Sequence, residues 1–154
     1  IKMESPYHNF VANGIVVHNC GKTLTTICLL QAWQSRMNLI ICPKSVTGVW
    51  RREFGKHCGV SHQVVILEGS SKQKAAMLEQ GKLKARSYGL NAFVINYESS
   101  WREFIGEALQ STMWDCVVCD ESHRIKEMSS NQSKFAATLS TVSHRRLALT
   151  GTVM

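Results

Sequence analysis

From residue 20 onward, short runs of consecutive apolar residues alternate with longer stretches of helix-like composition. Apolar runs of four or five residues without polar alternation indicate strands that are covered on both faces. Strand and helix in repeated alternation predict an α/β fold, in which a parallel sheet carries helices on both faces in three layers. The expected strands are Leu39–Cys42, Val64–Leu67, Ala92–Ile95, Cys116–Cys119 and Leu147–Leu149, and the expected helices are Lys22–Ser35, Val46–His57, Ser71–Ala85, Trp101–Leu109 and Asn131–Leu139.

Residues 1–19 have a different pattern. Two short β-type runs, Asn9–Ala12 and Ile15–Val17, flank Asn13-Gly14, which is the strongest short signal for a two-residue hairpin turn. We therefore expect a small β-hairpin ahead of the α/β region.

Composition restricts the class of protein. The 18 Lys and Arg residues exceed the 11 Asp and Glu residues by seven, and a net charge of +7 suits a polyanionic partner. No apolar run approaches the roughly 18–20 residues that a membrane span needs. Glu4 stands where a signal peptide should be positive. We expect neither a membrane protein nor a secreted one.

The cysteines indicate a reducing, cytoplasmic location. Six cysteines in 154 residues are too few for a disulfide scaffold. Cys116 and Cys119 are spaced like a metal or redox pair, but residues three apart on a strand point to opposite faces and cannot share a metal. Buried, inert thiols are the favoured interpretation over a metal or redox site.

The sequence Cys20-Gly21-Lys22-Thr23, followed by a helical stretch, matches the second half of a P-loop. In a P-loop, backbone N–H groups face the phosphates, the lysine reaches the β- and γ-phosphates, and the hydroxyl residue binds Mg²⁺. The full motif also requires a glycine five positions before Gly21, where this chain has Val16. The residues that precede Cys20 therefore do not match the first half of the P-loop motif.

Two acids, Asp120 and Glu121, follow the apolar run that ends at Cys119. In P-loop ATPases an aspartate at a strand end holds Mg²⁺, and a glutamate can polarise the attacking water. The alternative is an ordinary helix N-terminus. The P-loop half earlier in the chain favours the first interpretation.

Several motifs fall just after expected strands or at helix starts. They are Lys22, Pro43-Lys44, Asp120-Glu121 and Thr150–Thr152. Open parallel sheets bind their ligands at the edge where the strands end, so these motifs predict one site at that edge.

Two further features have competing interpretations. Residues 72–86 carry five cations, which form either a solvated helix face or part of a surface that follows a phosphate backbone. Trp33, Trp50, Trp101 and Trp114 are expected to pack in the core rather than to stack on bases.

The ordered motifs of residues 20–154 resemble those of Swi/Snf-type superfamily-two helicases. The stretches that carry the resemblance are Cys20–Thr23, Asn38–Val46, Val94–Ser99, Val118–Lys126 and Arg146–Thr152, which look like motifs I, Ia, Ib, II and III. The resemblance implies the first, RecA-like lobe of a DNA-stimulated ATPase that uses ATP and Mg²⁺, with double-stranded DNA or another nucleic acid as partner, in a bacterial or phage-encoded protein.

The resemblance also implies roles for individual residues. Lys22 would contact phosphate together with Cys20 and Gly21, Thr23 and Asp120 would hold Mg²⁺, and Glu121 would activate water. His123, Thr150, Gly151 and Thr152 would couple hydrolysis to movement, and the turns at Pro43-Lys44 and Asn96-Tyr97 would face the nucleic acid.

Residues 20–154 depart from the helicase pattern in three ways. Val153 stands where these proteins usually have proline. Neither the strand that normally precedes the P-loop nor a second lobe with its arginine finger is recognisable. We therefore expect an incomplete lobe, with negligible turnover in isolation.

Residues 8–20 resemble the C-terminal splicing block of inteins, which divides the chain into an intein fragment, residues 1–19, and the lobe. Cys20 would accept the upstream segment as a thioester, Asn19 would cyclise, and His8 and His18 would manage the protons. The alternative, a strand that enters the P-loop directly, leaves only three residues between Val17 and Gly21. An upstream intein body and N-terminal extein would then be partners.

Three functions remain in competition. The first is a fragment of a DNA-dependent ATPase motor whose P-loop an intein interrupts. The second is a chain whose only own activity is splicing or C-terminal cleavage. The third is a non-catalytic DNA-binding lobe.

Overall fold

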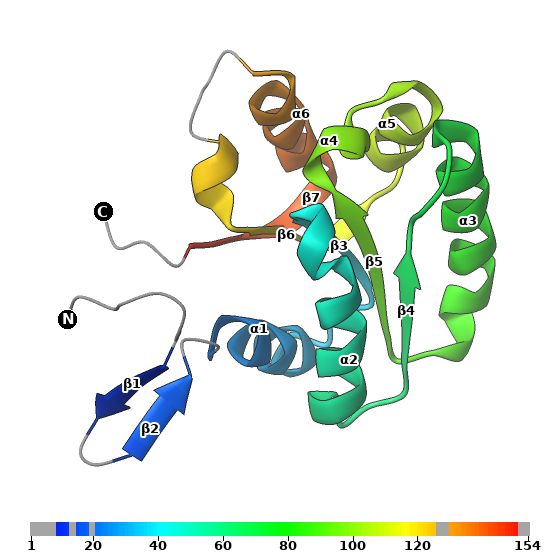
Figure 1. The fold of residues 1–154 in the computed structure, drawn as a ribbon. Coiled ribbons are helices and arrows are strands. Elements are labelled where there is room, and N and C mark those ends of the chain that lie inside the picture. Colours follow the sequence, from blue (N-terminus) through cyan, green and yellow to red (C-terminus); the bar gives the residue numbers. More distant parts are fainter. Residues whose placement is uncertain (1–8, 13–14, 19–20, 126–129, 151–154) are drawn as a thin grey trace.

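The computed structural model describes residues 9–12, 15–18, 21–125 and 130–150, and side chains within residues 21–123 and 130–150. Five parallel strands form one sheet, as the sequence predicted, and their order in the structure is β4-β5-β3-β6-β7 (Figure 1). The strands are β3 (Met37–Cys42), β4 (His62–Ile66), β5 (Leu90–Asn96), β6 (Trp114–Asp120) and β7 (Ser143–Leu149). None of the described helices is long and apolar enough to span a membrane.

Helices cover both faces of the sheet, which confirms the three-layer arrangement (Figure 1). One face carries the helices α1 (Gly21–Ala32) and α2 (Thr47–His57). The other carries α3 (Ser71–Lys84), α5 (Glu103–Gln110) and α6 (Asn131–Leu139). The short elements between them are α4 (Tyr97–Ser100) and the 3₁₀ turns η1 (Lys44–Val46), η2 (Ala85–Ser87), η3 (Ser122–Ile125) and η4 (Ser140–Val142).

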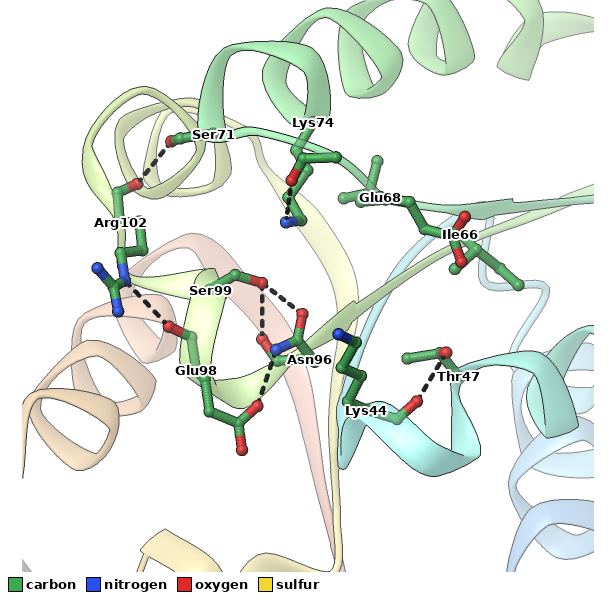
Figure 2. A pocket seen from close by; sticks show the side chains of 12 residues that line it. Lys44, Thr47, Ile66, Glu68, Ser71, Lys74, Asn96, Glu98, Ser99 and Arg102 are labelled. Carbon is green, nitrogen blue, oxygen red and sulfur yellow. Dashed lines mark hydrogen bonds between the residues drawn. The ribbon is translucent and has the colours of Figure 1, made fainter.

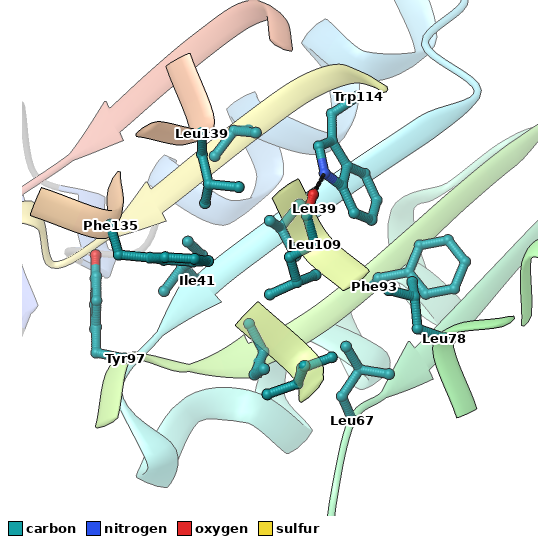
Figure 3. Close-up of a cluster of buried hydrophobic side chains, with 13 residues drawn as sticks. Leu39, Ile41, Leu67, Leu78, Phe93, Tyr97, Leu109, Trp114, Phe135 and Leu139 are labelled. Atoms are coloured by element: carbon teal, nitrogen blue, oxygen red, sulfur yellow. Dashed lines mark hydrogen bonds between the residues drawn. The ribbon is translucent and has the colours of Figure 1, made fainter. Parts of the chain in front are cut away.

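Two apolar clusters fix these layers to the sheet. Figure 3 shows the cluster under α3, α5 and α6, in which Trp114, Phe93 and Leu109 are fully buried. The second cluster joins α1 and α2 to the opposite face through Ile27, Trp50 and their neighbours. Alternate strand residues supply the two clusters because side chains on a strand point to opposite faces.

Local signals explain where helices begin. Ser70 caps α3 with a reciprocal pair of bonds: its hydroxyl accepts from the Gln73 N–H at 3.3 Å, and its own N–H donates to the Gln73 side chain at 2.8 Å. Ser130 caps α6 through the Ser133 N–H at 3.1 Å. The expected helix at Trp101–Leu109 starts two residues later, at Glu103, because Trp101 and Arg102 form the turn after α4.

The cysteine prediction is confirmed for one pair. Cys116 packs into the α1/α2 cluster and Cys119 packs against the opposite cluster, so their thiols lie on different faces. No group of three or more potential metal ligands of the His, Cys, Asp and Glu types occurs within the described residues.

The expected strand at Leu147–Leu149 is present, but the prediction that it is buried on both faces is wrong. Ala148 is exposed, and Leu147 and Leu149 are only partly buried. The cause is the position of β7 at the edge of the sheet, where β6 is its one partner among the described strands.

The N-terminal strands β1 (Asn9–Ala12) and β2 (Ile15–His18) form their own two-stranded antiparallel sheet, in which Asn9 pairs with His18. The predicted strands are therefore present, and the turn expected at Asn13-Gly14 lies outside the described residues. Neither strand pairs with the five-stranded sheet.

Candidate functional site

The carboxyl ends of the central strands bring distant segments to one level. Ile41 pairs with Cys119 across β3 and β6, and Cys42 pairs with Asn96 across β3 and β5. The residues that follow these strands therefore meet along one edge, where parallel sheets place their ligands.

The P-loop half and the acidic pair meet at this edge. The Lys22 Nζ atom, in the first turn of α1, lies 3.0 Å from Glu121 Oε1, although the two residues are 99 apart in sequence. Both side chains are about one-third exposed, and such pairs contribute only about 0–1 kcal/mol. The ammonium group can therefore exchange this carboxylate for another anion at little cost.

Asp120 is the buried member of the acidic pair, at 8% exposure. Its Oδ1 atom accepts from the Glu121 N–H at 3.0 Å, and its Oδ2 atom accepts from the indole N–H of Trp50 at 3.1 Å. Burial raises the pKa of this carboxyl, and the Trp50 hydrogen bond opposes that rise. The Asp120 carboxylate thus lies where burial disfavours its charged form, and two hydrogen-bond donors orient it.

Glu121 adopts a left-handed backbone conformation with φ of +53°. Such a conformation costs a non-glycine residue on the order of 1–3 kcal/mol and is concentrated at functional sites. The turn directs Glu121 toward Lys22, while the Nδ1 atom of His123 lies 3.2 Å from the other carboxylate oxygen.

The oxygen donors at this edge fit a magnesium ion that is shared with a phosphate. Mg²⁺ in nucleotide sites is held by one or two protein oxygens plus phosphate and water oxygens. Asp120 supplies a carboxylate, in which each oxygen has one hydrogen bond and retains a further lone pair. Thr23 supplies a hydroxyl in the first turn of α1, next to Lys22.

A cavity of about 860 Å³ opens at the same edge, over β4 and β5 (Figure 2). Lys44, Lys74 and Arg102 bring positive charge to it, and Glu68 and Glu98 also line it. Lys74 is 8% exposed, and its Nζ atom donates to the carbonyl of Gly69 at 2.7 Å. Burial, and then the charge of Lys44, lower the pKa of Lys74. An anion in the cavity would stabilise this ammonium group.

The basic run at residues 72–86 is thus divided. Lys72, Lys84 and Arg86 are exposed, as the solvated-face interpretation predicts, whereas Lys74 turns into the cavity. Helical periodicity alone did not separate Lys74 from its neighbours.

The two turns that were expected to face nucleic acid contribute unequally. Lys44 and Asn96 line the cavity, but Pro43 and Tyr97 are buried. The Tyr97 ring packs in the core, and its hydroxyl donates to the Asp120 carbonyl at 2.8 Å. Tyr97 therefore supports the acidic strand end, and its phenol is not on the surface.

Sequence reasoning missed the second role of Trp50. Its burial was predicted and is confirmed at 1% exposure, but its hydrogen bond to Asp120 was not foreseen. A buried indole N–H needs an acceptor, which is the signal that could have prompted the search for one. No comparable feature of the sequence indicated that Arg102 lines the cavity.

Part of the predicted site lies outside the described residues. Cys20, Asn19, His8, Gly151 and Thr152 belong to this group, and His18 is described by its backbone alone, as the last residue of β2. Thr150 follows β7 and is exposed.

A parallel α/β sheet with a lysine, two adjacent acids and a cationic cavity along one edge has the arrangement of a RecA-like lobe. The SNF2-related domain family matches residues 3–154. The chain belongs to this family.

Individual relatives agree with that assignment. Switch 2 of Arabidopsis thaliana is 34% identical over 127 residues, which cover 82% of this chain and 13% of that protein. The ISWI chromatin-remodeling complex ATPase ISW2 of Saccharomyces cerevisiae is 35% identical over 137 residues, which cover 86% of this chain and 12% of that protein. The chain thus spans about an eighth of the length of these curated relatives.

A solved structure shows the same fold. The Sulfolobus solfataricus SWI2/SNF2 ATPase core in complex with dsDNA superimposes with a TM-score of 0.66 at 25% identity, over 88% of this chain and 26% of that one. The RecA-like α/β fold of a Swi/Snf-type lobe is therefore established for this chain.

Proposed function

We propose that residues 20–154 form the ATP-binding lobe of a DNA-dependent ATPase motor. The observation that carries the proposal is the meeting of Lys22 with Glu121, directly beside the buried Asp120. Three charged groups from two motifs converge there, as binding of a triphosphate and a metal requires.

Each residue has a distinct task in this proposal. Lys22 leaves Glu121 and binds phosphate oxygens, while the backbone N–H groups at the start of α1 face the same anion. Asp120 and Thr23 hold Mg²⁺, which supplies charge neutralisation to the phosphates when bound. Glu121, released from Lys22, orients the attacking water, and His123 with Thr150–Thr152 transmits the change to neighbouring segments.

The cavity between η1, α3 and α4 is the proposed contact for the nucleic-acid backbone. Lys44, Lys74 and Arg102 suit phosphate oxygens, and Asn96 adds an amide at the same rim. The net charge of +7 strengthens such binding over the whole lobe.

We further propose that residues 1–19 are the tail of an intein. Strand–helix–strand units are right-handed, so the direction in which a connection crosses the sheet decides which face its helix covers. In this sheet, a connection that crosses in the direction from β3 to β4 has its helix on the face that carries α1 and α2. Helix α1 lies on that face and leads into β3, so a parallel strand entering α1 belongs beyond β7. The strand β2 pairs only with β1 instead, which supports its being a foreign element.

The proposed splicing chemistry is confined to residues 8–20. The Cys20 thiolate attacks the carbonyl carbon at the end of the upstream extein, so that a thioester to Cys20 forms and the bond between that carbonyl and the intein breaks. The side-chain nitrogen of Asn19 attacks its own backbone carbonyl, which breaks the Asn19–Cys20 peptide bond and frees the Cys20 amine. The freed Cys20 amine then attacks the thioester carbonyl, which forms a peptide bond, breaks the carbon–sulfur bond and regenerates the thiol. His8 and His18 transfer the protons of the cleavage at Asn19.

The ATPase proposal is tested on the spliced parent protein. Hydrolysis with and without DNA is measured for the wild type, for Lys22→Ala, and for Lys56→Ala as the matched control, since Lys56 is an exposed lysine paired with Glu53. We expect Lys22→Ala to lower the DNA-stimulated rate at least about 100-fold and Lys56→Ala to leave it unchanged. Equal rates for Lys22→Ala and the wild type would refute the proposal.

The intein proposal is tested on the purified 154-residue chain. We expect mass spectrometry to detect slow release of a fragment that begins at Cys20, and Asn19→Ala to abolish it. Asn131→Ala, at the exposed start of α6, is the control and should cleave normally. Cleavage of Asn19→Ala at the wild-type rate would eliminate the intein interpretation and favour β2 as an ordinary strand of the lobe.

The cavity also favours a second candidate function, a DNA-binding lobe without catalysis. That function predicts DNA binding with steep salt dependence and no response to nucleotide. A change in DNA affinity upon addition of ATP and Mg²⁺ would exclude it.

A further inference from the structure

Two buried side chains from outside β6 donate hydrogen bonds to Asp120. The indole N–H of Trp50, on α2, donates to Oδ2 at 3.1 Å, and the hydroxyl of Tyr97, on α4, donates to the backbone carbonyl at 2.8 Å. Both side chains are 1% exposed, so water does not compete for these bonds. Two elements that are separate in sequence thus fix the same carboxylate residue.

Each of these elements begins at the cavity, within one turn of the side chain that donates to Asp120. Helix α2 starts at Thr47, which lines the cavity together with Lys44, and the Thr47 hydroxyl donates to the Lys44 carbonyl at 3.0 Å. Trp50 lies one turn further along the same helix. Asn96 lines the cavity and directly precedes Tyr97. A ligand that moves either rim element therefore moves a donor of Asp120.

We propose that Trp50 and Tyr97 are positioning residues that hold Asp120 in its metal-binding orientation and connect it to the occupied or empty state of the cavity. The inference rests on the proposed ATPase function, whose metal ligand is Asp120. It adds a route by which binding of a nucleic-acid backbone in the cavity changes the orientation of Asp120.

The physical basis is the short range of hydrogen bonding. A bond of about 3 Å weakens steeply when its donor moves or tilts, and a charge-assisted bond is worth about 1.5–3 kcal/mol. Asp120 is only 8% exposed, so water does not readily replace a lost donor, and the carboxylate is then no longer held in one orientation. A small displacement of α2 or α4 is therefore enough to change metal affinity.

A second tryptophan provides an internal comparison. Trp114 is equally buried, and its indole N–H donates to the Leu109 carbonyl at 2.9 Å, within the cluster on the other face. It has the same chemistry as Trp50 but no bond to Asp120. Any effect that is specific to Trp50 therefore reports on Asp120 rather than on core packing in general.

The test uses the spliced parent protein, as for the ATPase proposal, and follows its assigned indole N–H signals by nuclear magnetic resonance. Mn²⁺ with ADP serves as a paramagnetic probe of the metal site, and duplex DNA of about 20 base pairs serves as the probe of the cavity. We expect Mn²⁺–ADP to broaden the Trp50 signal selectively. We expect DNA alone, without nucleotide, to shift the Trp50 signal and to leave the Trp114 signal in place.

Variants measure the strength of the connection. Tyr97→Phe removes one oxygen, and Trp50→Phe removes the indole donor; their controls are Tyr88→Phe and Trp114→Phe. We expect the Mn²⁺ midpoint, measured by calorimetry in the presence of ADP, to rise about tenfold in Tyr97→Phe and Trp50→Phe, with metal-free ADP binding unchanged. If Trp50→Phe does not fold, the Mn²⁺ midpoint of Tyr97→Phe by itself tests the inference.

The outcomes separate the inference from the proposed function. A wild-type midpoint in Tyr97→Phe, or a Trp50 signal that DNA does not move, overturns the positioning roles while the wild type still binds Mn²⁺–ADP. A wild-type chain without metal-dependent ADP binding overturns the proposed function, and the inference with it.

Discussion

A single lysine illustrates how burial changes the task of a charged residue. Lys74 lies on a helix on which Lys72 and Lys84 are exposed, yet its ammonium group is held inside the cavity by the Gly69 carbonyl. Its lowered pKa means that the folded protein already disfavours the charged form there. A phosphate oxygen in the cavity would offset that cost.

We therefore predict that Lys74→Met weakens DNA binding. The variant keeps the apolar stem and removes the charge, so the slope of log affinity against log salt concentration should become less negative by about 1. Fluorescence anisotropy with labelled duplex DNA over a range of salt concentrations measures the slope.

The control for Lys74→Met is Lys56→Met, on α2, whose lysine is largely exposed. Its slope should match that of the wild type. An unchanged slope in Lys74→Met would show that DNA does not use the cavity.

The residue scale also marks the limit of sequence reasoning about the site. Lys22, Asp120 and Glu121 were identified because their motifs are local and ordered along the chain. The bond between Trp50 and Asp120 joins residues 70 apart, and no local pattern specifies which indole meets which carboxylate. The burial of Tyr97 was missed for the same reason, since a turn after a strand exposes some of its residues and buries others.

At the scale of single elements, helix α3 depends on one small residue. Gly81 faces the sheet, and a Cβ atom there would lie 2.5 Å from Phe93 Cε1 and 3.2 Å from Val65 Cγ2. Glycine in a helix normally costs about 1 kcal/mol relative to alanine, so its presence here is explained by close packing.

We predict that Gly81→Ala destabilises the protein by about 1–3 kcal/mol, because Phe93 is fully buried and must move. Gly55→Ala is the matched control on α2, where a Cβ atom meets nothing within 4 Å. That variant should be stabilised by about 0.5–1 kcal/mol. Urea denaturation followed by circular dichroism compares the two, and equal changes would contradict the packing argument.

The elements themselves were largely predictable. Apolar runs such as Leu39–Cys42 and Ala92–Ile95 specify buried strands because a strand between two helix layers has no polar side. The run at Leu147–Leu149 looks the same in sequence but lies at an edge. The number of neighbours that a strand has is a property of topology, and composition does not reveal it.

At the scale of the whole molecule, buried thiols make the fold sensitive to alkali. Burial raises the pKa of Cys42 to about 12 and the pKa values of Cys116 and Cys119 to about 11, from an ordinary 9.0. The unfolded chain therefore loses these protons first. The stability that the thiols contribute is fully present below pH 9 and is lost as the pH rises toward 11–12.

We predict that the free energy of unfolding, from urea titrations, falls between pH 9 and 11 by up to about 1.4 kcal/mol per pH unit for each thiol. Cys42→Ala should show a shallower fall, whereas Cys28→Ala, which changes an exposed thiol, should follow the wild type. Parallel curves for Cys42→Ala and the wild type would disprove this account.

The outer edge of β7, which pairs with none of the described strands, has a consequence for association between copies of the chain. A strand whose backbone groups await a partner invites a second copy of the same molecule to pair with it. Here His144, Arg145 and Arg146 are exposed along that strand, and two such edges would bring like charges together. Electrostatic repulsion thus disfavours pairing of two copies along this edge, whereas an apolar strand without those cations would meet no such repulsion.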